Sequence, residues 1–114
     1  MPATLAFYEA AFGLQTGILH DDGYGELRTG DTKLAFSSHA LMASIGKSVA
    51  TSAPEHLAFE LAFEMPDVAA ALVQALAAGA ILVTPVTEMS RGQILADVRS
   101  PEGTLGELCT AVAG

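Results

Sequence analysis

The chain has 114 residues, of which 51% are hydrophobic, and its five Lys and Arg against thirteen Asp and Glu give a formal net charge of −8. This length suits one compact domain, and the shortage of basic residues argues against a nucleic-acid partner. No uninterrupted apolar stretch predicts a membrane span, no export signal is visible, and Cys109 is the single cysteine, so we expect a cytoplasmic protein without a disulfide.

The first predicted element is a helix over Pro2–Phe12. It places Leu5, Tyr8 and Phe12 on one face and stops at Gly13. Extended segments with turn residues between them follow this helix. We predict strands over 14–20, 24–29 and 32–38, with turns at 21–23 and 30–31.

The next part of the chain is a Ser- and Ala-rich connector, residues 39–55, for which no helix or strand is predicted. After it, apolar and other residues alternate strictly over His56–Met65. This pattern predicts a strand with one face packed on helices and one open face. Phe59 and Leu61 belong to the packed face, and His56 and Glu60 to the open face.

A second helix is predicted over Pro66–Ala78, with Gly79 as its stop signal. Its predicted apolar face carries Ala69, Leu72, Val73 and Leu76. Three further strands are expected over 81–87, 93–99 and 104–112, with turns at 90–92 and 100–103.

The order of one helix and three strands therefore occurs twice. We predict one α+β domain, with an αβββ unit over 1–38, the connector 39–55, and a βαβββ unit over 56–114. The first unit lacks the opening strand that the second has, because its equivalent would precede Met1. An edge left exposed in this way calls for upstream sequence or for another chain, and we expect a homodimer.

Three segments in this order resemble the glyoxalase/bleomycin-resistance protein/dioxygenase group, the vicinal oxygen chelate superfamily. Phe7–Leu14 resembles the first helix and its exit, and Pro66–Ala80 resembles the second helix. Val98–Leu108 is similar to the usual ending V-R-D-P-D-G-x-x-x-E-L. The resemblance implies two βαβββ units that form a curved mixed sheet around a cavity, often across a dimer.

In metal-dependent members of that superfamily, one ligand comes from the first strand and one from the last strand of each unit. Carried onto this chain, the resemblance gives a missing residue, Ala35, Glu60 and Glu107. Ala35 has no donor atom, so half of the ligand set is absent. The resemblance therefore implies a ligand pocket that needs no metal. If a divalent metal were bound, Glu60 and Glu107 would hold it.

Alternation supports a pocket built on the same two glutamates. Glu107 shares a face with Leu105 and Cys109, and if the strands lie at equivalent places, Glu60 and Glu107 enter one cavity. Two neighbouring carboxylates bind a proton, a cation or a metal, because they cannot both ionise cheaply. The alternative is that they are ordinary solvated side chains.

Other residues are secondary candidates for this pocket. Asp97 is expected to alternate with Arg99 and to pair with it. His56 would reach Glu60 only if the sheet bends strongly. Cys109 looks toward the cavity, although a lone cysteine usually serves packing.

Three functions remain open on this basis. The leading hypothesis is a protein that binds a small cationic, drug-like ligand without metal, as bleomycin-resistance proteins do, because the chain is acidic. The second is a metal-dependent lyase, isomerase or dioxygenase, which needs ligands that this sequence does not supply. The third is a non-catalytic interaction module or truncated family member.

Overall fold

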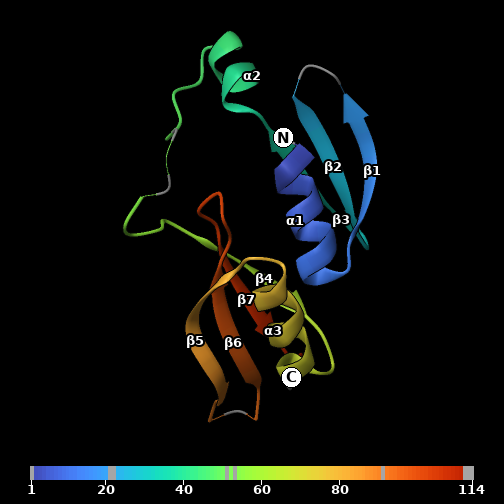
Figure 1. The fold of residues 1–114 in the computed structure, drawn as a ribbon, viewed down its shortest axis with the longest axis vertical. Helices are drawn as coiled ribbons and strands as arrows, with labels where there is room; N and C mark the ends of the chain where they lie inside the picture. The colour runs from blue at the N-terminus through green and yellow to red at the C-terminus, as the bar shows by residue number, and fades with distance from the viewer. Residues whose placement is uncertain (1, 21–22, 51, 53, 91, 112–114) are drawn as a thin grey trace.

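The computed structural model describes residues 2–20, 23–50, 52, 54–90 and 92–111. Figure 1 shows two halves, with the first helix and its sheet above and the third helix and its sheet below. In chain order the elements are α1 (Pro2–Phe12), β1 (Gln15–His20), β2 (Tyr24–Thr29), β3 (Thr32–Ser37), α2 (His39–Ser44), β4 (Glu60–Glu64), α3 (Val68–Ala77), β5 (Ile81–Glu88), β6 (Ile94–Arg99) and β7 (Leu105–Cys109). No helix among these residues is long and apolar enough to cross a lipid bilayer.

The strands form two sheets. The first is a three-stranded antiparallel sheet in the order β1-β2-β3, and the second is four-stranded in the order β4-β7-β6-β5. In the second sheet β4 runs parallel to β7, whereas β5, β6 and β7 pair antiparallel. The predicted α+β fold is thus confirmed, and among the described residues the first sheet has no strand that corresponds to β4.

Both helices end where a glycine was expected to stop them. Gly13 has a φ of 68° and Gly79 a φ of 111°, a left-handed conformation that costs glycine little and other residues much. The helices therefore end at equivalent places in the two units, which supports the internal repeat.

The core lies between the helices and one face of each sheet. In the first unit, the buried Leu5 of α1 lies beside Gly25 of β2, and the buried Tyr8 ring lies 4.8 Å from the ring of Phe36 in β3; Leu27 of β2 is 2% exposed. In the second unit, Val98 and Leu108 are fully buried beneath α3. The predicted apolar face of the first helix is therefore confirmed.

Aromatic rings join the two units. Phe12, at the end of α1, stacks on Phe63 of β4 with ring centroids 4.5 Å apart and planes 13° apart. The Tyr8 ring also lies next to Phe12, with 5.5 Å between the ring centroids. The side-chain amide of Gln74 in α3 also donates a hydrogen bond of 2.7 Å to the Ala10 carbonyl in α1. These contacts couple the halves without any strand pairing between the described parts of the two sheets.

The predicted apolar face of α3 is partly wrong. Val73 is 69% exposed and Leu76 39% exposed, whereas Ala75 is fully buried and Val68 nearly so. The helix turns a smaller, Ala-rich face inward, because α1 packs directly against it. Small side chains let the two helix backbones approach closely, and the larger apolar residues are left outside.

The predicted strand over His56–Met65 is also too long. Only Glu60–Glu64 forms β4. Phe59, expected on the packed face, is 66% exposed. The alternation starts before Glu60, whereas the parallel partner strand β7 begins only at Leu105, opposite Glu60, and offers no pairing before that point.

The connector contains a helix that the sequence did not indicate. In α2 the Ser38 hydroxyl accepts a hydrogen bond from the backbone N–H of Leu41, which caps the first turn. None of its residues is buried. This helix is therefore stabilised by its cap rather than by burial of an apolar face. The predicted turns at 21–23 and 90–92 and the end of the strand 104–112 include residues 21, 22, 91 and 112, which lie outside the described residues.

Candidate functional site

Three carboxylates meet on the open face of the second sheet. Asp97 of β6 lies directly opposite Glu107 of β7, and β4, which carries Glu60, pairs with the other edge of β7. One carboxylate oxygen from each of the three residues lies within 4.8 Å of those from the other two. The structure thus brings together Glu60 and Glu107, as expected from alternation, and adds Asp97 to them. We call these three residues the acidic cluster.

Charge crowding within the acidic cluster affects Glu107 most. Burial raises the pKa of Glu107, and the negative charges of Glu60 and Asp97 raise it further. One carboxylate oxygen of Asp97, Oδ1, is buried and has no hydrogen-bond partner among the described residues. A cation or a proton would offset both effects.

Cys109 shares this face but is not an activated nucleophile. Its side chain is buried, and its thiol donates a hydrogen bond to the Phe63 carbonyl at 3.8 Å. Burial raises the pKa of this thiol, and the charge of Glu107 raises it further. A thiolate is therefore disfavoured, and the role of Cys109 is packing beside the cluster.

Two expected neighbours of the acidic cluster are not there. Arg99 was expected to pair with Asp97, but its guanidinium donates hydrogen bonds to the carbonyls of Pro54 and Glu55 and so holds the end of the connector. His56 precedes β4 and is exposed, so it does not share the alternation that places Glu60. The carboxylate of Asp97 therefore has no cationic partner among the described residues.

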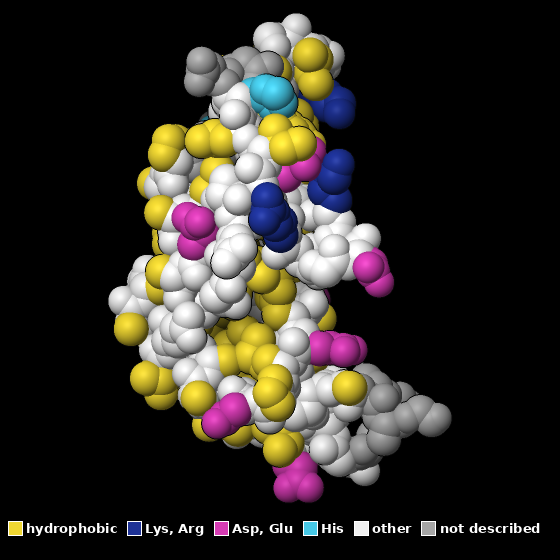
Figure 2. Space-filling model, turned by 90° about the vertical axis from the view of Figure 1, so that its right-hand side faces the viewer, with side chains coloured by type: hydrophobic (Ala, Val, Ile, Leu, Met, Phe, Trp, Pro, Cys, Tyr) yellow, Lys and Arg dark blue, Asp and Glu magenta, His cyan; other side chains and the backbone are white. Residues whose placement is uncertain are grey.

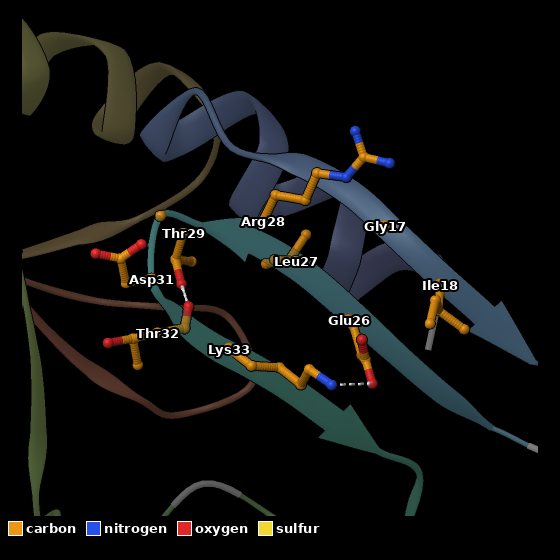
Figure 3. Close-up of a pocket in the computed structure, with 10 residues that line it drawn as sticks. Gly17, Ile18, Glu26, Leu27, Arg28, Thr29, Asp31, Thr32 and Lys33 are labelled. Carbon is orange, nitrogen blue, oxygen red and sulfur yellow. Dashed lines mark hydrogen bonds and ion pairs between the residues drawn. The ribbon is translucent and has the colours of Figure 1, made fainter.

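The first sheet carries a different arrangement at the equivalent positions. Ala35 lies opposite Glu26 in the pairing of β2 with β3. Glu26 accepts a 2.5 Å hydrogen bond from the Tyr24 hydroxyl. It also lies 3.5 Å from the Lys33 ammonium (Figure 3). The Tyr24 hydrogen bond lowers the pKa of Glu26, and Lys33 lowers it further. Glu26 thus already has a hydrogen-bond donor and a cationic partner, whereas the acidic cluster has no cationic partner among the described residues.

Arg28 lies beside this arrangement and points away from Lys33, along the β1 side of the sheet (Figure 3). Together these side chains border a shallow pocket of about 580 Å³. On the face drawn in Figure 2, the Lys and Arg side chains all lie over the upper half of the molecule. The open face of the first sheet thus carries Arg28 and Lys33, which lie opposite each other, whereas that of the second carries the acidic cluster.

A larger groove of about 1060 Å³ separates the two sheets. Its walls come from the end of α1 and from β3 on one side and from β4 on the other, and Glu107 and Cys109 reach it from β7. Apolar side chains also gather around the middle of the face shown in Figure 2. The predicted cavity is thus an open groove, because the two sheets do not join. Its apolar lining consists mainly of Phe12, Leu14, Leu34, Leu61, Phe63 and Met65.

Solved structures with this architecture are known. The chain superimposes on a glyoxalase-related enzyme from Fulvimarina pelagi with a TM-score of 0.80 and 21% identity, over 97% of this chain and 80% of that one. A glyoxalase/bleomycin resistance protein/dioxygenase family enzyme from Burkholderia phytofirmans gives 0.79 and 24%, over 98% and 90%. A protein of the same description from Nocardioides gives 0.75 and 16%, over 99% and 77%. Neither a protein-family model nor a curated protein matches the sequence.

These similarities confirm the fold that the sequence motifs implied. The chain has the vicinal oxygen chelate architecture, with two units built on the same plan. At these identities the likeness concerns the fold alone. What the site does must be argued from its own residues.

Proposed function

We propose that this chain binds a small cationic, drug-sized ligand at the acidic cluster, without needing a metal. The observation that carries the proposal is the meeting of three carboxylates on one sheet face with no basic side chain paired to them among the described residues. A ligand ammonium or amidinium group has only N–H donors, and it would donate hydrogen bonds to all three carboxylates. The adjoining groove supplies apolar surface for the body of the ligand.

The test is calorimetric titration with spermidine as an organic cation. We expect saturable binding that weakens about tenfold or more in Glu107→Gln, since charge-assisted hydrogen bonds contribute roughly 1.5–3 kcal/mol each. Because the pKa of Glu107 is raised, acidification protonates it earlier than an ordinary glutamate. Affinity is therefore present above this raised pKa and is lost as the pH falls through it.

Glu88→Gln is the matched control, because it removes the same charge at the far end of β5. It should change affinity less than about twofold, as expected for a screened surface charge. Equal losses in both variants would mean that only the net charge attracts spermidine, and the proposed site would be wrong.

A metal-dependent enzyme is the second candidate, and Asp97 is the observation that favours it. Glu60 and Glu107 alone are a poor divalent site, but a third carboxylate gives an all-oxygen set of the kind that Mn²⁺ or Mg²⁺ prefers. A metal held there would act as a Lewis acid. Parallel titration with Mn²⁺ distinguishes the two. Tight one-to-one Mn²⁺ binding that excludes spermidine would favour the enzyme.

We also propose that the chain forms a homodimer. The second unit exposes apolar side chains on its edge strand β5, among them Ile81 at 61% and Val83 at 52%. Exposed apolar edges of this kind favour association. Light scattering at micromolar concentration should give twice the mass of one chain. The Val83→Lys variant should give the mass of a single chain. A monomer for the unaltered chain would contradict the proposal.

A further inference from the structure

The groove between the two sheets carries opposite charges on its two walls. Arg28 and Lys33 line it on the side of the first sheet, and Glu64 and Glu107 line it on the side of the second. The whole chain has only five Lys and Arg residues, so two of them on one wall concentrate its scarce positive charge. A ligand that fills the groove therefore meets a basic wall and an acidic wall.

The two walls do not neutralise each other. Within the part of the chain that the structure describes, Lys33 pairs with Glu26, and both residues belong to the first sheet. No described carboxylate of the second sheet lies within ion-pair distance of Arg28 or Lys33. The opposite charges thus border an open space of about 1060 Å³, at the upper end of the roughly 300–1,000 Å³ of small-molecule pockets.

Arg28 is the more available of the two cations on the basic wall. The register of β2 against β3 places it opposite Lys33, as the register of β6 against β7 places Arg99 opposite Leu105. The guanidinium of Arg99 is engaged, because it donates hydrogen bonds to two carbonyls of the connector. Arg28 forms no ion pair with a described carboxylate. Its guanidinium can therefore bind an anionic group from outside the chain.

Neither cationic head group is fixed in one position. The Lys33 ammonium points toward Glu26, and the Arg28 side chain points along the β1 side of the sheet (Figure 3). A Cβ added at Gly17 would lie 3.6 Å from the Arg28 side chain, so Arg28 lies across this glycine. Both Arg28 and Lys33 are exposed, and exposed side chains change rotamer within picoseconds to nanoseconds. An anion at this wall therefore selects among rotamers that exchange freely.

Apolar surface lies between the charged walls. Phe12 of α1, Leu34 of β3 and Phe63 of β4 all line the groove. Figure 2 shows apolar side chains around the middle of the face, below the Lys and Arg side chains. Small-molecule sites usually combine such apolar lining with a few polar groups that fix the orientation of the ligand. A ligand that bridges the walls is thus apolar in its middle and charged at both ends.

We propose that the groove selects small zwitterions, in which an ammonium or amidinium group and an oxyanion such as a carboxylate are joined by an apolar body. This inference rests on the proposed function, because it assigns the cationic end to the acidic cluster. It adds an anionic end, to which Arg28 and Lys33 donate charge-assisted hydrogen bonds. A ligand that carries only positive charge leaves the basic wall without a partner and is repelled by it.

Probes of equal length with one or two charged ends test this selection. They are the ω-amino acids aminohexanoate, aminooctanoate and aminodecanoate, each compared with the n-alkylamine of the same carbon number at low ionic strength. Amide chemical shifts of the isotope-labelled chain measure the binding. At least one amino acid should bind about fivefold more tightly than its amine, the upper range for an exposed ion pair. It should also shift amides of β2 and β3 that the amine leaves unchanged.

Arg28→Gln tests the anionic end, because it removes a cation that has no carboxylate partner among the described residues. It should abolish the advantage of the amino acid and keep amine binding within about twofold. Lys47→Gln is the matched control, since it removes the same charge from a residue beyond α2, outside the groove lining. This control should retain the full advantage. Equal losses in both variants would mean that net charge alone is at work and would overturn the inference.

The remaining outcomes separate this inference from the proposed function. If amino acids bind no better than amines, and amine binding is weakened by Glu107→Gln, the cationic site stands and the zwitterion inference is overturned. An advantage that persists in Arg28→Gln would place the carboxylate elsewhere and overturn it too. If neither amino acids nor amines bind, the acidic cluster is not a cation site, and the proposed function and the inference are both wrong.

Discussion

Replacing Leu108 by alanine is expected to lower the free energy of unfolding by about 2–5 kcal/mol, the range measured for buried leucines. Leu108 is fully buried in β7, between its pairing partners Phe63 of β4 and Ala96 of β6. Ala96 is too small to fill the space, and strands on both sides of β7 hold its backbone in place. The cavity that Leu108→Ala creates therefore does not collapse, and the loss of contacts lowers the free energy of unfolding by its full amount.

Urea denaturation followed by far-ultraviolet circular dichroism measures this effect. The midpoint should fall while the slope of the transition stays constant. Val73→Ala is the control, because it removes a similar apolar group from a position that is 69% exposed, and its effect should lie within about 0.5 kcal/mol. Equal losses for both variants would mean that the second unit is not packed as described.

Phe12→Ala is expected to destabilise the chain by about 2–4 kcal/mol, somewhat below the range for fully buried phenylalanines because Phe12 is only half-buried. Its ring touches three others, those of Phe7, Tyr8 and Phe63. The contact with Phe63 connects the first unit to the second. The loss should therefore also make unfolding of the two units less cooperative.

Hydrogen exchange resolves this second effect. In Phe12→Ala, amides of β2 and β3 should exchange faster than those of β6 and β7, whereas the unaltered chain loses both sets together. Phe59→Ala is the control, since Phe59 is 66% exposed and lies outside the strands. Uniform acceleration across both units would show that Phe12 contributes to overall stability without coupling the halves.

Much of the fold could be predicted from local pattern. The first helix was predicted with the bounds that the structure gives, because Pro2 and Gly13 mark its two ends by backbone conformation alone. Strand 24–29 was likewise predicted with its observed bounds. Wherever a boundary depends on a partner far along the chain, as at the start of β4, the local pattern was insufficient.

The inward face of α3 shows the same limit. Hydrophobicity favours Val73 and Leu76 as core residues, yet the neighbouring helix requires a close approach and selects Ala75. Helix α2 was missed because its one clear signal is a serine cap, and its apolar residues have no core to face.

The candidate site was half predictable. Alternation within each strand placed Glu60 and Glu107 on the open face, and both lie there. Asp97 was expected to pair with Arg99, its neighbour two residues on. Its actual neighbour, Glu107, depends on the register of β6 against β7, which the turn between them sets. Whether these residues bind a ligand stays a prediction.

The absence of strand pairing between the described parts of the two sheets has a mechanical consequence. The contacts between the two units include the packing of α1 against α3, the stack of Phe12 on Phe63 and the hydrogen bond from Gln74 to the Ala10 carbonyl. The angle at which α1 and α3 cross therefore determines how far apart the two sheets lie. We predict that occupancy of the groove changes this crossing, and a pair of spectroscopic labels on α1 and α3, which lie outside the acidic cluster, tests this.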